Sequence, residues 1–99
     1  MKGFMTESES FELAQFLKQK RVITGLSQKD VAEKLGYSTS QFISNWERGV
    51  SQPPLHTLRK LSNLYKISAE EMFNVLLKTT IAQVEVDLKR KFYSNDVSI

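Results

Sequence analysis

A group of amide and hydroxyl side chains recurs at helical spacing in the middle of the chain. The group consists of Thr39, Ser40, Gln41, Ser44 and Asn45. An amide can pair with adenine through two hydrogen bonds, and a hydroxyl can either donate or accept. Each good two-bond contact contributes roughly 1–3 kcal/mol of discrimination against the wrong base. The chemistry suits the reading of base edges in a DNA groove, but by itself it also fits a solvated helix face, so the flanking sequence must decide.

No pattern typical of catalysis accompanies this group. The carboxylates are scattered over expected helix surfaces, no glycine-rich phosphate loop is present, and no nucleophile stands beside a base. The chain has no cysteine, which excludes a disulfide framework, a thiol nucleophile and a cysteine zinc site. His56 is the single histidine, and without partner residues it indicates neither a metal site nor catalysis. We therefore expect no enzyme activity, no cofactor and no metal.

The length and composition fit one small domain. Ninety-nine residues with 40% hydrophobic and 10% aromatic content can build a core without metals or disulfides. No apolar run approaches the roughly 20 residues of a membrane span, and the N-terminus lacks the apolar segment of a signal peptide. The formal net charge of +3 permits a polyanionic partner without demanding one. These properties predict a cytoplasmic protein that does not enter a membrane.

Three glycines divide the middle of the chain into two short helices joined by a tight turn. They are Gly25, Gly36 and Gly49. The segment from Ser27 to Asp30 has the pattern S-x-x-D of a capping box, which opens the first of the two helices. Glycine is the residue that most readily ends a helix in the left-handed conformation, so each helix has a predicted end as well as a predicted start.

The second of these helices carries the amide and hydroxyl group, and we place it at about residues 39–48. We expect a side chain in the preceding turn to cap it, either Ser38 or Thr39. Its apolar side chains are expected to pack inward, and they are Phe42, Ile43 and Trp46. The amide and hydroxyl groups then lie on the outward side.

Helices are also expected before and after this pair. Ser10 could cap a first helix, Pro53-Pro54 presets the start of a fourth, and the capping box from Ser68 to Glu71 opens a fifth. Residues 1–9 are expected to form a flexible arm, and residues 94–99 a frayed tail.

The fifth helix is longer than a closing helix for so small a core requires. Its apolar residues recur at spacings of four, four, three, four and four, and they are Phe73, Leu77, Ile81, Val84, Leu88 and Phe92. The first half of this helix, with Met72 and Phe73, is expected to cover the domain's own core. The second half is expected to contact a second subunit through Ile81, Val84, Leu88 and Phe92.

The two central helices carry the string Leu26-Ser27-Gln28…Val31-Ala32…Leu35-Gly36…Ile43-Ser44…Trp46-Glu47-Arg48-Gly49. This string resembles the helix-turn-helix domain of the XRE family, the phage-repressor and Cro-like transcription regulators. The resemblance covers roughly residues 11–75. It implies an all-α fold, a five-helix repressor-like DNA-binding domain at residues 10–75, here followed by an extended C-terminal helix at residues 76–93. The second helix would cross the DNA backbone and the third would lie in the major groove.

The resemblance also implies roles for individual residues. Base contacts would come from Thr39, Ser40, Gln41, Ser44 and Asn45. The chain has one residue more than the usual family spacing before Trp46, so which of Thr39, Ser40 and Gln41 meets the first base stays open. Gln28 and Arg48 match residues that approach phosphates, and Lys29 stands beside the first of these. Arg21 matches an arginine that commonly pairs with the glutamate at Glu47, as a structural ion pair.

The sequence therefore predicts a transcriptional regulator that binds specific double-stranded DNA, a repressor on family grounds, as a homodimer on a pseudo-palindromic site. The alternative is a protein-interaction module, antitoxin-like or a polymerase-binding adaptor, whose C-terminal helix binds a different protein. Because the chain ends soon after the fifth helix, we expect regulation by protein concentration, by a partner or by proteolysis.

Overall fold

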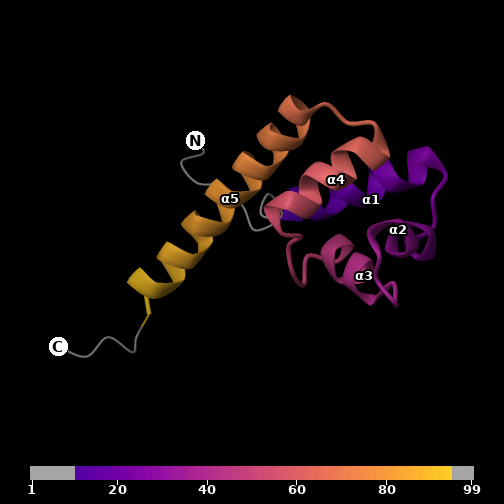
Figure 1. Cartoon of the computed structure of the whole chain (residues 1–99). Coiled ribbons are helices and arrows are strands. Elements are labelled where there is room, and N and C mark those ends of the chain that lie inside the picture. Colours follow the sequence, from indigo (N-terminus) through magenta and orange to yellow (C-terminus); the bar gives the residue numbers. More distant parts are fainter. Residues whose placement is uncertain (1–10, 95–99) are drawn as a thin grey trace.

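The structure is a computed structural model that describes residues 11–94 (Figure 1). Within this range the chain forms five helices and no strand, which confirms the predicted all-α class. The helices are α1 (Glu12–Thr24), α2 (Gln28–Leu35), α3 (Gln41–Glu47), α4 (Leu55–Tyr65) and α5 (Ala69–Phe92). The predicted arm, the Ser10 cap and residues 95–99 of the predicted tail lie outside the described residues. No helix in the described part is long and apolar enough to cross a membrane.

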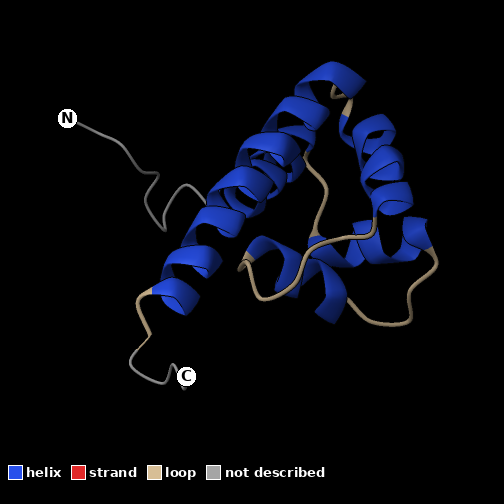
Figure 2. Ribbon diagram, turned by 90° about the vertical axis from the view of Figure 1, so that its left-hand side faces the viewer, coloured by secondary structure: helices blue, strands red, loops and turns tan. Residues whose placement is uncertain are grey.

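The core lies between the first four helices and one side of α5. The largest fully buried side chains come one from each of α1 to α4, and they are Leu17, Val31, Ile43 and Leu61. Burial of such a side chain contributes roughly 1.5–3 kcal/mol, so these four residues fix how α2 and α3 sit on the bundle. Figures 1 and 2 show α5 running along one side, with its C-terminal half extending beyond the other helices.

The local signals that start and end α2 are present as predicted. The Ser27 hydroxyl accepts a hydrogen bond from the Asp30 backbone N–H, and the Asp30 carboxylate accepts one from the Ser27 backbone N–H, each at 2.9 Å. The backbone bond from Ser27 stabilises the charged carboxylate and so lowers the pKa of Asp30. Gly36 ends the helix at φ 87°, a left-handed conformation that costs glycine little.

Helix α3 begins two residues later than predicted, at Gln41. Ser40 occupies the N-cap position and makes no side-chain capping bond. The Thr39 hydroxyl instead accepts a hydrogen bond from the Gln41 backbone N–H at 3.2 Å.

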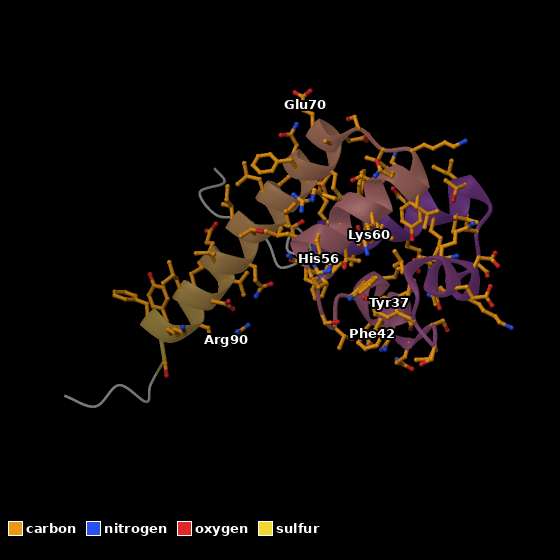
Figure 3. The ribbon with its side chains drawn as sticks, viewed as in Figure 1. Tyr37, Phe42, His56, Lys60, Glu70 and Arg90 are labelled. Carbon is orange, nitrogen blue, oxygen red and sulfur yellow. The ribbon has the colours of Figure 1, made fainter. Side chains whose placement is uncertain are left out.

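The inward side of α3 is narrower than predicted. Ile43 and Trp46 are buried, with 1% and 4% of their surfaces exposed, but Phe42 is 49% exposed. The Phe42 ring lies against Tyr37, with 4.9 Å between the ring centroids (Figure 3). A helix of seven residues offers only about two turns to the core, so Phe42 falls at the edge of the buried face and covers the turn instead.

The face of α5 that packs on the domain also differs from the prediction. Met72, Thr79 and Ala82 are buried, but Phe73 is 58% exposed, so its predicted place in the core is wrong. The six apolar residues that recur along α5 are each 46–78% exposed. We call them the exposed stripe, and they are Phe73, Leu77, Ile81, Val84, Leu88 and Phe92. Helix α5 therefore has two apolar faces, one docked and one open.

A threonine of α5 completes the start of α1. Phe11 occupies the N-cap position of α1 and makes no side-chain capping bond. The Thr79 hydroxyl accepts a hydrogen bond from the Leu13 backbone N–H at 3.0 Å, and Lys78 pairs with Glu12 at 3.2 Å. Capping bonds of this kind contribute about 1 kcal/mol, so α5 is part of the domain's structure well beyond its first turns.

Candidate nucleic-acid interface

A buried ion pair joins α1 to α3 beneath the candidate interface. Arg21 donates two hydrogen bonds to the Glu47 carboxylate, at 2.6 Å and 3.0 Å. The two side chains are only 11% and 3% exposed. A third bond joins the guanidinium to the Leu26 carbonyl at 2.9 Å, which adds the turn between α1 and α2. The hydrogen bond with Glu47 raises the pKa of Arg21, so the guanidinium stays charged.

Gln28 extends this pair to the start of α2. Its side-chain amide donates to the Glu47 carboxylate at 3.0 Å, which fixes the direction of the Gln28 side chain. Lys29 follows and is exposed. Both stand in the first turn of α2, where free backbone N–H groups and the helix dipole favour a negatively charged group such as a phosphate.

The outward side of α3 carries a hydrogen-bond network. The Asn45 side-chain oxygen accepts one bond from the Gln41 amide at 3.0 Å and another from the Arg48 guanidinium at 2.7 Å. Arg48 also donates to the Ser44 hydroxyl at 3.3 Å. Four of the predicted DNA-contacting residues are thus held together on one face.

Gln41 and Asn45 differ in the hydrogen-bond donors and acceptors that they have left after these bonds are made. The Gln41 oxygen accepts no bond from residues 11–94, and one N–H of its amide is also left over. Gln41 therefore keeps one acceptor and one donor, which are the two kinds of group that a two-bond contact with adenine uses. The Asn45 oxygen is already used twice, which leaves its N–H groups as donors to an acceptor on a base.

A family model described as helix-turn-helix matches residues 17–72, which is more than half of the chain. This chain belongs to the XRE-type helix-turn-helix family of transcriptional regulators. The match runs from the middle of α1 into the first turn of α5, and so includes the ion pair, the turn and the whole of α3. The resemblance found in the sequence is confirmed.

Two relatives of this XRE-type chain come from Bacillus subtilis (strain 168). The HTH-type transcriptional regulator ImmR is 43% identical over 58 residues, which are 59% of this chain and 45% of ImmR. The SPbeta prophage-derived uncharacterized HTH-type transcriptional regulator YonR is 41% identical over 71 residues, 72% of this chain and 61% of YonR. The chain thus spans about half to three fifths of the length of these relatives. No solved structure matches it significantly.

The other predicted contacts of this XRE-type domain lie in the turn before α3. Thr39 is exposed and its hydroxyl is engaged with the backbone of Gln41, while Ser40 is half-buried. Gln41 is the first residue of α3 and is exposed. Among Thr39, Ser40 and Gln41, Gln41 is therefore the residue that is both exposed and part of α3.

The described part of the chain contains no cluster of side chains of the kind that binds a metal ion. No group of three or more histidine, cysteine, aspartate or glutamate side chains between residues 11 and 94 could hold a metal ion. His56 is exposed in the first turn of α4 (Figure 3). The network centred on Asn45 was not predicted from the sequence. Gln41 and Asn45 are four residues apart, however, and this is a spacing at which side chains of a helix meet.

Proposed function

We propose that this chain regulates transcription by binding specific double-stranded DNA with α3 in the major groove. The observation that carries the proposal is the ordered face of Gln41, Asn45 and Arg48, held on the buried pair of Arg21 and Glu47. A rigidly supported set of amide groups suits base recognition, because less side-chain freedom is lost on binding. Membership of a regulator family, and two relatives named as HTH-type transcriptional regulators, support DNA as the partner.

The proposed contacts divide into those that read bases and those that hold the backbone. The residues that face bases are Thr39, Ser40, Gln41, Ser44 and Asn45. The residues that face phosphates are Gln28, Lys29 and Arg48. Phosphate contacts fix the register of the protein on the duplex, and base contacts supply the sequence preference. We place the protein in the cytoplasm as a repressor on the ground of its family.

The proposed form is a homodimer that pairs through the exposed stripe of α5. Six apolar side chains in a row, each 46–78% exposed, form a surface that a second copy of the same helix would cover. Between them lies a shallow apolar hollow lined mainly by Ile81, Val84, Leu88 and Phe92, into which side chains of a second helix can fit. A dimer would place two α3 helices about one DNA turn apart, roughly 34 Å, on a pseudo-palindromic site.

The test of DNA binding begins with selection of bound sequences from a random DNA pool. The affinity of the wild type for the selected site is then compared with those of Gln41→Ala and Asn45→Ala by fluorescence anisotropy. Each variant is expected to lose roughly 1–3 kcal/mol of specific binding, about 5- to 150-fold, with little change for unrelated DNA. Gln19→Ala, in an exposed position of α1, is the matched control. Undiminished specific binding by both variants would refute the proposed recognition face.

A second candidate rests on the same stripe. A protein-interaction module, antitoxin-like or a polymerase-binding adaptor, would use this apolar helix face for a different protein. That function predicts a monomer in sedimentation and no specific DNA enriched from the random pool. A dimer together with a symmetric selected site would exclude it as the main function.

A further inference from the structure

We infer that the two copies of α5 pair in antiparallel directions, about a two-fold axis that passes between Ala82 and Gln83. The inference rests on the proposed dimer and specifies how its two helices are arranged. Three observations support it: the spacing of the exposed stripe, the side of α5 on which the domain lies, and the distribution of charge along the helix.

The spacing of the exposed stripe is the same in both directions. From Phe73 to Phe92 the steps are four, four, three, four and four residues. In an antiparallel pair centred after Ala82, every apolar residue therefore lies level with another apolar residue of the second copy. Leu77 lies level with Leu88, and Ile81 with Val84, so the two helices form apolar layers without a mismatch.

The domain does not obstruct such a pair. The buried residues Met72, Thr79 and Ala82 lie on the face of α5 opposite to the stripe. A second helix can therefore approach the stripe over its whole length. The C-terminal half of each α5, which extends beyond its own domain in Figure 1, would lie along the domain-supported half of the other copy.

The charges at the two ends of α5 select the direction. The first turn contains Glu70 and Glu71, and the last turn contains Lys89, Arg90 and Lys91. Figure 3 shows Glu70 and Arg90 near opposite ends of the helix. A parallel pair would bring acidic turns together and basic turns together, whereas an antiparallel pair brings Lys91 of one copy within one helical turn of Glu70 of the other. The helix dipoles oppose each other in the same arrangement.

The direct test uses cysteine crosslinking, because the chain has no cysteine of its own. Asn74 and Lys91 are exposed, lie outside the stripe, and would be level with each other in the antiparallel pair. Asn74→Cys and Lys91→Cys are made as separate variants of the full chain, one with a mass tag, and treated with a short bis-maleimide. The 17 residues between the positions span about 26 Å of helix, which is beyond the reach of the reagent.

We expect each variant alone to give almost no crosslinked dimer and the mixture to give at least tenfold more heterodimer. Self-crosslinking by each variant alone would show a parallel pair and overturn this inference, while leaving the dimer of the proposed function in place. A dimer without crosslinks in any sample would also overturn it. A monomeric wild type in sedimentation would overturn the proposed dimer itself, and DNA binding is measured separately. Circular dichroism spectra confirm that both variants fold.

Exchange of charge gives a second readout that does not depend on cysteine. Glu70→Lys and Lys91→Glu each replace attraction with repulsion in an antiparallel dimer, so each should raise the dimer dissociation constant roughly threefold or more. The double variant restores opposite charges and should return close to the wild type. Equal dissociation constants for all four proteins would contradict the antiparallel arrangement.

Discussion

At the scale of single residues, Asn45 is the centre of the hydrogen-bond network on the outward side of α3. Its side-chain oxygen accepts bonds from Gln41 and Arg48, so two long side chains are held before any ligand is present. The residue types at the site could be predicted from the sequence, because their helical spacing and the flanking motif are local properties. Their mutual hydrogen bonds could not, because several rotamers of each side chain are compatible with the same helix.

The buried charge of Glu47 gives a prediction about stability. In Glu47→Ala the Arg21 guanidinium remains mostly buried without its carboxylate, and the Gln28 amide loses its acceptor. We expect the free energy of unfolding to fall by about 3 kcal/mol, as measured by urea denaturation.

The control for this prediction is Glu33→Ala, an exposed glutamate of α2. Its substitution should change the unfolding free energy by no more than about 0.5 kcal/mol. Similar losses in the two variants would mean that the ion pair does not hold α1 to α3.

At the scale of helices, boundaries that are set by local residues can be predicted from the sequence, whereas the choice of the face that is buried cannot. The start of α2 at Ser27 and its end at Gly36 follow from the residues themselves. The open and docked faces of α5 do not, because both are apolar and periodicity alone cannot say which one meets the core. The sequence therefore predicts Phe73 in the core, whereas the buried residues of α5 include a polar one, Thr79.

The end of α4 is a helix boundary that the sequence does not signal. Lys66 ends this helix in the left-handed conformation, at φ 59°, and is the only non-glycine residue with positive φ between residues 11 and 94. A side chain in this conformation costs roughly 1–2 kcal/mol, which glycine avoids.

Lys66→Gly should therefore stabilise the protein by about 0.5–1 kcal/mol, after allowance for the greater freedom of glycine in the unfolded chain. The expected observation is a higher melting temperature by calorimetry. Lys60→Gly, in the interior of α4, is the matched control and should instead lower the melting temperature. A lower melting temperature for Lys66→Gly would show that the Lys66 side chain contributes contacts that outweigh its backbone strain.

At the scale of the whole molecule, the docked and open faces of α5 do not divide at the boundary predicted after residue 75. Ala82 is completely buried and Thr79 caps α1, so the domain uses α5 at least to Ala82. The stripe on the other face begins at Phe73, within the same turns. Folding and the proposed dimerisation are therefore superimposed on one helix rather than placed one after the other.

Truncation experiments should show this overlap. A chain that ends at Leu77 lacks Thr79 and Ala82, and we expect it to lose at least about 2 kcal/mol of unfolding free energy. A chain that ends at Gln83 keeps both residues and should stay folded, while losing the dimer. Urea denaturation and sedimentation of the two chains measure these effects.

The variant Thr79→Val removes only the hydroxyl that accepts the bond from Leu13, and so separates this bond from the other effects of truncation. We expect it to lower the free energy of unfolding by about 1 kcal/mol. Equal stability of the two truncated chains would show that the docked face of α5 contributes nothing beyond Leu77.

The bond between Leu13 and Thr79 also has a consequence for synthesis of the protein on the ribosome. Its two ends lie 66 residues apart, and the acceptor belongs to α5, which is made after α1 to α4. Chains emerge from the N-terminus at about 5–20 residues per second, so Leu13 leaves the ribosome roughly 3–13 s before the group that completes the start of α1. A nascent chain in which Thr79 completes the start of α1 has therefore already made the first two residues of its exposed stripe, Phe73 and Leu77. In the proposed dimer, two chains translated from one messenger can begin to pair as soon as their domains close.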